Sequence, residues 1–277
     1  MATGSNVTRD AAWVEREYGR EKWPQVLAMI REEIAEEGDE PSLSRVVSRV
    51  ARREWYGDRG GLAAREAIFG GARASVPAAV AHGGHQRLIV ESVIAACSPE
   101  TDLVAELGSG WGYNLFNTWL GGGPADARYV AAEYTEAGRE ATCLLAALED
   151  RLMLTTVEFD YHAPDRTEID RATHAVVFTA HSIEQIPALP SGALEWIASL
   201  ADRVTCVHLE PVSWQVEDAA GGSSREYAER HDYNRNLIDT LRRAAADARL
   251  TIDLEVTDVV GENPENSTTL VVWRTAG

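Results

Sequence analysis

The chain has 277 residues, of which 45% are hydrophobic and 25% are charged, so it has enough apolar residues to bury a substantial core. Its 44 Asp and Glu residues outnumber the 26 Lys and Arg residues, which gives a formal net charge of −18. This balance argues against a nucleic acid as partner, because binding to phosphates needs clustered basic side chains. It is compatible with a small-molecule ligand, including a cationic one.

The first hundred residues are expected to be helical, with no strand before residue 102. Apolar residues recur at helical spacing over 11–36, where Pro24 is expected to mark a first turn or a break. Further helices are expected over Ser42–Trp55 and, after the glycine-rich passage 70–84, over His85–Cys97. We expect this region, residues 1–100, to cover the site or to form a dimer interface, which makes a homodimer one possible assembly.

After residue 102, short β-branched runs alternate with helical segments. Strands are expected at 103–107, 129–133, 154–159, 175–179 and 204–209, and helices at 114–120, 136–150, 191–200 and 225–249. Two final strands, 251–260 and 268–273, have no helix between them. The alternation requires right-handed crossovers and a parallel sheet, whereas the final pair introduces one antiparallel strand. We therefore expect residues 101–277 to form a doubly wound α/β domain with a seven-stranded, mostly parallel sheet.

The sequence also bears on the compartment. No apolar run approaches the roughly 18 residues that a membrane span needs, and the N-terminus has no basic segment followed by an apolar one. The three cysteines (Cys97, Cys143 and Cys206) are scattered, which argues against disulfides or a structural zinc. We expect a cytoplasmic protein with no membrane partner. The strong preference for arginine over lysine, together with abundant alanine, suggests a bacterial source.

The strongest local signal is a glycine-rich turn, Glu106-Leu-Gly108-Ser-Gly110-Trp-Gly112, that follows the first strand of this domain and opens into a helix. Backbone N–H groups at such a turn can face a nucleotide-like ligand. Tyr113 stands where a dinucleotide-binding fingerprint requires Gly or Ala, and no P-loop pattern is present. A nicotinamide-dependent oxidoreductase is therefore disfavoured.

The pattern acid-x-Gly-x-Gly-x-Gly resembles motif I of the class I S-adenosylmethionine-dependent methyltransferases, and the resemblance covers residues 102–277. It implies S-adenosylmethionine as cofactor, with Glu133 accepting hydrogen bonds from the ribose hydroxyls and Asp160 contacting the adenine amino group. The closing hairpin matches the reversed last strand of that family. The cofactor-binding residues that the resemblance implies are Glu106, Gly108, Ser109, Gly110, Gly112, Glu133, Tyr134, Asp160, Tyr161 and Thr179.

Two polar segments, 179–185 and 208–215, follow the fourth and fifth strands, where open α/β sheets bind ligands. His181 is the candidate general base, because imidazole titrates near neutral pH. Glu184 and Glu210 are expected to hold a cationic acceptor through charge-assisted hydrogen bonds or to orient the base. The residues expected to bind the substrate are Gln185, Trp214, Tyr227 and His231.

The acceptor stays open at this point. Paired glutamates and the negative charge favour an amine or guanidino nitrogen of a small molecule, as in small-molecule biosynthesis. A hydroxyl or carboxylate of a natural product or peptide is the alternative, with His181 as base. No acidic residue directly follows the fourth strand, so we expect a metal-independent enzyme. A hypothesis from another class is a non-catalytic, cofactor-binding partner subunit, which would not need the two polar segments.

Overall fold

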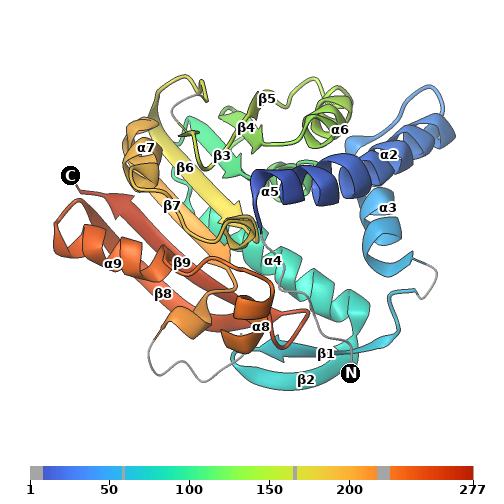
Figure 1. Ribbon diagram of the computed structural model, residues 1–277. Coiled ribbons are helices and arrows are strands. Elements are labelled where there is room, and N and C mark those ends of the chain that lie inside the picture. Colours follow the sequence, from blue (N-terminus) through green and yellow to red (C-terminus); the bar gives the residue numbers. More distant parts are fainter. Residues whose placement is uncertain (1–8, 58–59, 165–166, 217–224, 277) are drawn as a thin grey trace.

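A nine-stranded mixed sheet with helices on both faces forms the body of the molecule (Figure 1). The computed structural model describes residues 9–57, 60–164, 167–216 and 225–276. The strand order is β2-β1-β8-β9-β7-β6-β3-β4-β5. The expected α/β class is confirmed. The expected number of seven strands is wrong, because two more strands extend the sheet at one edge.

Every strand expected after residue 102 is present. Their bounds are β3 Leu103–Leu107, β4 Arg128–Glu133, β5 Leu154–Glu158, β6 Ala172–Ala180, β7 Ala201–Glu210, β8 Leu250–Gly261 and β9 Thr268–Thr275. Strands β3 to β7 pair in parallel, whereas β9 runs antiparallel to both β7 and β8. The block from β5 to β8 thus has the reversed last strand that the resemblance to class I methyltransferases implies.

The two additional strands form a hairpin in the region expected to be helical. Strand β1 (Ala64–Phe69) pairs with β2 (Ala72–Pro77) and joins the sheet beside β8, at the lower edge in Figure 1. Gly70 and Gly71, both at positive φ (56° and 78°), make the two-residue turn. The glycines of this passage predicted only a break between helical segments, whereas the Gly-Gly pair between alternating residues is the signal for a hairpin.

The remaining N-terminal elements are helical, as expected. They are α1 (Ala11–Val14), a π-helix η1 (Glu15–Lys22), α2 (Trp23–Glu37), α3 (Leu43–Tyr56) and α4 (Ala78–Ala96). Pro24 lies in the first turn of α2, directly after the π-helix η1, and the chain stays helical across it. Helix α4 starts at Ala78 rather than at His85 and continues through Gly83 and Gly84.

The helices of the α/β part are α5 (Tyr113–Leu120), α6 (Glu136–Ala146), α7 (Ala193–Ser199), α8 (Arg225–Arg230) and α9 (Leu237–Ala246). The single helix expected over 225–249 is wrong, because the chain breaks between α8 and α9. Asp232 has a positive φ of 55°. The buried Asn234 side chain accepts the N–H groups of Asn236 and Leu237 and donates to the Ile186 carbonyl, which fixes the break. None of the helices described is long and apolar enough to cross a bilayer.

Two apolar cores lie on the two faces of the sheet. Leu103, Ala105 and Leu107 of β3 pack with α7 and α9, whereas Val104 faces the core formed with α2 to α6. A central strand buried on both faces reads as a continuous apolar run, as β3 does. The chain leaves β3 towards β4 on one side and returns to β6 on the other. The carboxyl ends of β3 and β6 therefore flank the point at which open α/β sheets form ligand sites.

The hairpin turn can be tested by two identical substitutions with opposite expected signs. Gly71 and Gly83 both have open space where a Cβ would be added, but only Gly71 has a positive φ. Gly71→Ala should lower the free energy of unfolding by about 1 kcal/mol through backbone strain, whereas Gly83→Ala in helix α4 should raise it by about 0.5–1 kcal/mol. Urea unfolding of the two variants checks this. Equal effects would contradict a strained turn at Gly71.

Candidate active site

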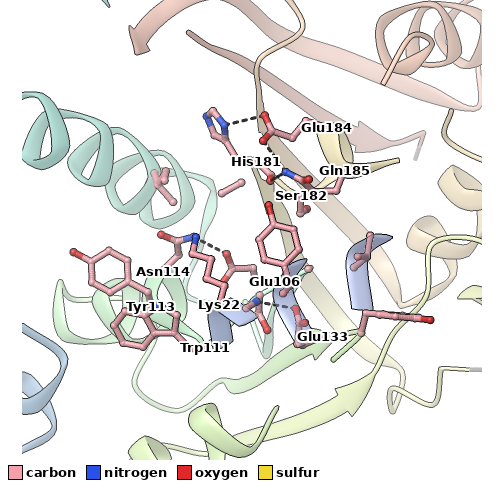
Figure 2. A pocket seen from close by; sticks show the side chains of 18 of the residues that line it. Lys22, Glu106, Trp111, Tyr113, Asn114, Glu133, His181, Ser182, Glu184 and Gln185 are labelled. Carbon is pink, nitrogen blue, oxygen red and sulfur yellow. Dashed lines mark hydrogen bonds and ion pairs between the residues drawn. The ribbon is translucent and has the colours of Figure 1, made fainter. Parts of the chain in front are cut away.

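A cavity of about 670 Å³ lies at the carboxyl ends of β3, β4 and β6. Its walls include the glycine turn after β3, the loop after β6, the β8–β9 connection and the N-terminal segment from Arg9 to Trp23, together with side chains from α3, α4 and the segments that follow β4 and β5. Figure 2 shows the turn residues and Lys22 in one group and His181, Glu184 and Gln185 in another. The expected site residues that line this cavity are Glu106, Gly108, Ser109, Gly110, Glu133, Tyr134, Asp160, Tyr161, His181, Glu184 and Gln185.

The glycine turn is fixed by backbone conformation and by close neighbours. Gly108, Gly110 and Gly112 have φ values of 75°, 56° and 79°, a region that side chains disfavour. A Cβ on Gly108 would lie 2.5 Å from Ser182 Cβ, and one on Gly110 would lie 2.7 Å from Trp23 Cζ2. The turn is thus enclosed between the loop after β6 and the start of α2.

Glu133, at the end of β4, holds this turn in place. Its Oε2 accepts the Gly110 N–H at 2.9 Å, and its Oε1 accepts both the N–H and the hydroxyl of Thr135 at 2.9 and 2.7 Å. Burial raises the pKa of Glu133 above its ordinary value, although these hydrogen bonds oppose the shift. Because a carboxylate offers about four acceptor sites, Oε2 can still accept a hydrogen bond from a ligand hydroxyl.

Glu106, the acidic residue of the turn motif, is buried and only half satisfied. Its Oε1 accepts the side-chain amide of Asn114 at 2.7 Å, whereas Oε2 has no hydrogen-bond partner among the residues described. Burial raises the pKa of Glu106 to about 8, and the nearby Glu133 charge adds to the shift. The neighbouring Ser109 hydroxyl is also buried without a partner in the described parts of the chain.

Unsatisfied buried polar atoms concentrate around this cavity. Within the described residues, those that line the cavity and lack a hydrogen-bond partner are Arg9 Nη1, Glu54 Oε1, Gln86 Nε2, Glu106 Oε2, Ser109 Oγ, Gln185 Oε1 and Asn266 Oδ1. Native proteins leave few such groups unpaired, because each costs about 1–3 kcal/mol. Their concentration here indicates a place prepared for polar ligand groups.

His181 and Glu184 are brought together in the loop after β6, as expected. His181 has a positive φ of 52°, uncommon outside glycine and found where a fold imposes strain. Its Nδ1 lies 3.1 Å from Glu184 Oε2, and its Nε2 lies 2.7 Å from the Thr268 hydroxyl. In this arrangement neither ring nitrogen is free to take a proton from a ligand, so a base role requires the bond to Thr268 to open.

A second histidine continues this network. His85 Nε2 lies 3.0 Å from the same Thr268 hydroxyl, and His85 Nδ1 lies 3.4 Å from Glu262 Oε1. Two of the four ring nitrogens face carboxylates, which only accept hydrogen bonds when ionised. The other two face the single hydroxyl of Thr268, which can donate one hydrogen bond. The Thr268 hydroxyl can donate to only one of the two rings, so it couples the protonation of His181 to that of His85, and an extra proton makes one ring an imidazolium.

Electrostatics decides which ring holds the extra proton. Burial alone would lower the pKa of His181, but the Glu184 carboxylate and, more weakly, Glu210 and Glu262 raise it above its ordinary value. Burial lowers the pKa of His85, a shift that Glu262 only partly opposes. When the pair takes up an extra proton, these opposite shifts favour His181 over His85 as the ring that holds it.

The network extends to residues that sequence reasoning did not select. Glu262 also accepts from His82 Nδ1 at 3.1 Å and pairs with Arg65 at 3.1 Å. Burial would raise the pKa of Glu262, but the hydrogen bonds from His82 and His85 hold it well below its ordinary value. His82 and His85 are three residues apart on α4, a spacing that places them on one face. That spacing was the available signal in the sequence, but their partners come from the β8–β9 connection.

Glu210 and Thr179 lie behind the cavity rather than in its wall. The Glu210 carboxylate, which is fully buried, accepts the backbone N–H groups of Ser182, Ile183 and Glu184 at 3.1–3.2 Å. Burial raises the pKa of Glu210 to about 7. Thr179 bonds His208 Nδ1 at 3.0 Å, and His208 Nε2 accepts the Trp273 indole N–H at 3.0 Å. Glu210 therefore positions the His181–Glu184 loop.

Three of the four expected substrate-binding residues, Trp214, Tyr227 and His231, do not line the cavity. Trp214 packs under the Arg225 guanidinium, whose carbon lies 5.1 Å from the centre of one Trp214 ring. Tyr227 and His231 stack with ring centres 4.0 Å apart. The His231 carbonyl accepts Arg9 Nε, so this pair supports the N-terminal segment. Sequence reasoning expected residues 1–100 to cover the site or to form a dimer interface but selected no site residue from them, because nothing local shows which of their side chains meet the turn.

The cavity wall is acidic. Its carboxylates are Asp10, Glu54, Glu106, Glu133, Asp160, Glu184 and Glu262, and its Lys and Arg residues are Arg9, Lys22 and Arg65. No Lys or Arg pairs with Glu184 among the described residues, where its partners are His181, Gln185 and Asn266. The parts of the chain that are described contain no group of three or more His, Cys, Asp or Glu side chains placed to hold a metal ion.

Comparison with known proteins gives only distant likenesses. No family model matches the sequence, and no curated protein matches it. Similar solved structures include magnesium protoporphyrin IX methyltransferase from Synechocystis PCC 6803 with bound S-adenosylmethionine (14% identity, TM-score 0.45, 70% of this chain and 81% of that chain). Others are a methyltransferase from Aquifex aeolicus (14%, 0.44, 69% and 93%) and an O-methyltransferase from Bacillus cereus (14%, 0.43, 69% and 80%). The function of this chain therefore has to be argued from its own residues.

The buried Glu106 carboxyl makes stability depend on pH. Its pKa rises from 4.5 in the unfolded chain to about 8 in the folded protein, so its contribution to stability is lost as pH rises through this window. At about pH 8, Glu106→Gln should therefore unfold at a higher urea concentration than the wild type, with a free energy of unfolding higher by on the order of 2–4 kcal/mol. At about pH 5 the two proteins should differ little. The exposed Glu36→Gln is the matched control. A pH-independent effect of Glu106→Gln would contradict the buried, protonated carboxyl.

Proposed function

We propose that this chain is a methyltransferase that uses S-adenosylmethionine as methyl donor. The observation that carries the proposal is the cavity over the glycine turn, where Glu106 Oε2 and Ser109 Oγ are buried beside Gly108 and Gly110 and have no hydrogen-bond partner in the described part of the chain. When bound, S-adenosylmethionine supplies a methyl group on an electrophilic sulfonium. The acidic wall favours a donor that carries positive charge on its sulfonium and its ammonium group.

The residues of the turn and of β4 suit the parts of this donor. Glu133 would accept a ribose hydroxyl at Oε2, and Glu106 would accept the donor ammonium, which satisfies its orphaned oxygen. Asp160 lies on the cavity wall with Tyr134 and Tyr161, and it would contact the adenine amino group. The Oδ1 atom of Asp160 already accepts the His162 N–H at 2.8 Å, so Oδ2 would accept the adenine amino group.

The acceptor is proposed to be a small, polar and cationic molecule that is methylated on an amine or guanidino nitrogen. Glu184 supports this proposal. Its side chain is only 7% exposed, and its carboxylate has no Lys or Arg partner among the described residues. A buried carboxylate of this kind stabilises a cation that donates hydrogen bonds. We propose that His181 holds Glu184 through Nδ1 and takes up the nitrogen-bound proton when its bond to Thr268 opens.

The N-terminal region is proposed to act as a lid over both ligands. Arg9 and Tyr18 line the cavity, and Trp23 lies against the glycine turn. An acidic cavity covered in this way fits a small-molecule acceptor better than a nucleic acid, which needs an open basic surface. The reaction is proposed to be metal-independent. A hydroxyl or carboxylate acceptor is the alternative, and a non-catalytic partner subunit would bind the donor without turnover.

Donor binding is tested by calorimetric titration with S-adenosylmethionine, S-adenosylhomocysteine and, as a control, NAD. The wild type should bind the first two and not NAD. Gly110→Arg should abolish binding, because its side chain would meet the Trp23 ring at a position with a φ of 56°. Gly122→Arg, at an exposed positive-φ glycine outside this cavity, should bind normally. If the wild type bound neither sulfur ligand, the methyltransferase proposal would be wrong.

Acceptor binding is tested by screening amines, guanidines, hydroxyl compounds and carboxylates with a labelled methyl donor. For a cationic acceptor, Glu184→Gln should raise KM by roughly tenfold or more, with donor affinity unchanged, because it removes the charge that faces the acceptor. His181→Ala should spare donor binding and lower kcat by on the order of a hundredfold. Methylation confined to hydroxyl or carboxylate compounds would favour the alternative, and donor binding with no transfer would favour the partner subunit.

A further inference from the structure

The chain contains one lysine, Lys22, and it lines the cavity. It is the last residue of the π-helix η1, a rare conformation that is frequent at functional sites. The Nζ atom lies 4.6 Å from the centre of the Trp23 ring and 5.5 and 5.7 Å from the rings of Trp55 and Tyr18. These rings face a cation favourably and restrict where the ammonium group can lie.

The ammonium group of Lys22 is tied to the glycine turn but keeps its hydrogen-bond donors. Glu54 Oε1 lies 3.5 Å from Nζ, and within the described residues Nζ makes no hydrogen bond. The other oxygen of Glu54 accepts the indole N–H of Trp111, the residue after Gly110, at 3.0 Å. Trp23, next to Lys22, covers Gly110 itself. Figure 2 shows Lys22 in the same group of side chains as Glu106 and Asn114.

The other two basic residues of the cavity wall have protein partners. Arg65 pairs with Glu262 at 3.1 Å. Arg9 donates Nε to the His231 carbonyl, and its guanidinium carbon lies 4.1 Å from the Trp13 ring centre and 4.7 Å from the Tyr233 ring centre. Lys22 is also paired, with Glu54, and Arg9 keeps one donor, Nη1, without a partner among the described residues. Lys22 differs from both arginines in its links to the glycine turn through Glu54 and the adjacent Trp23, which place it to meet an anionic ligand group there.

The charges of the proposed donor match this arrangement. S-adenosylmethionine has two cationic groups, the sulfonium and the ammonium, and one anionic group, the carboxylate of its methionine part. The carboxylates Glu106 and Glu133 suit cationic and hydroxyl groups. Neither of them favours the donor carboxylate, and the Glu133 charge would repel it unless a cation stood nearby.

We propose that Lys22 binds the carboxylate of the methyl donor, so that the N-terminal helical segment is part of the donor site and not only a lid. The inference rests on the proposed function and adds a specificity-determining residue to it. A ligand with the carboxylate holds η1 and α2 over the glycine turn. A nucleoside without it lacks this link.

Three ligands that differ only in the amino and carboxylate groups at one end separate the contributions of these groups to binding. S-adenosylhomocysteine has the amino and carboxylate groups, its decarboxylated counterpart lacks only the carboxylate, and 5′-methylthioadenosine lacks both. Lys22→Gln should lower the affinity for S-adenosylhomocysteine about tenfold, the effect of one charge-assisted hydrogen bond, and leave the other two within about twofold. Lys22→Arg should keep most of the affinity. Arg20→Gln removes a charge from the same helix outside the cavity and should change nothing.

Unchanged affinity for the other two ligands also shows that each variant is folded. Equal losses for S-adenosylhomocysteine and its decarboxylated counterpart would overturn the role of Lys22 towards the carboxylate, as would no loss for either. If the wild type bound none of the three ligands, the proposed function itself would fail. Binding of all three without any dependence on Lys22 would overturn this inference alone.

The single lysine allows a second test without substitution. Acetylation of the wild type by an amine-reactive reagent, followed by peptide mass analysis, measures the reactivity of Lys22 alone. S-adenosylhomocysteine should slow this reaction clearly more than the decarboxylated counterpart at equal occupancy, because the carboxylate engages the amine. Equal rates with the two ligands would contradict the proposal.

Discussion

The hydrogen bond from the Gly110 N–H to the Glu133 carboxylate is the interaction on which the site depends. It joins the turn after β3 to the end of β4, two parallel strands whose carboxyl ends meet at one edge of the sheet. The positive φ angles of the turn glycines let the backbone come close enough for this bond. Because the carboxylate is buried, the bond also fixes a negative charge at the floor of the cavity.

A second constraint comes from behind the site. Glu210 at the end of β7 accepts three successive N–H groups of the loop after β6, and this holds His181 and Glu184 towards the cavity. A series of side-chain hydrogen bonds runs from Trp273 through His208 to Thr179. Through it, the reversed strand β9 supports the end of β6, from which the loop starts. Burial lowers the pKa of His208 to about 3, which keeps this ring neutral and structural. The polar loops of the site are thus positioned by residues that need not touch a ligand.

Buried charge links the two ends of the cavity. Burial raises the pKa of Glu106 and of Glu133 at the turn, while Glu184 is bonded to His181 and Glu262 is paired with Arg65. Removing carboxylates from water is unfavourable unless partners replace the lost hydration. The acidic wall is therefore electrostatically unfavourable when the cavity holds no cation, and a cationic ligand would lower this cost on binding.

The sequence by itself determined the turn, the seven strands of the α/β block and the pairing of His181 with Glu184. These features are local: glycines at fixed spacing, apolar runs and two residues three positions apart. Only the tertiary structure decided that 64–77 is a hairpin, that 225–249 breaks at Asn234 and that Glu210 faces inward. It alone brought Lys22, His85 and Thr268 to the cavity, because those contacts join segments distant in sequence, and local pattern carries no information on which distant side chains will meet.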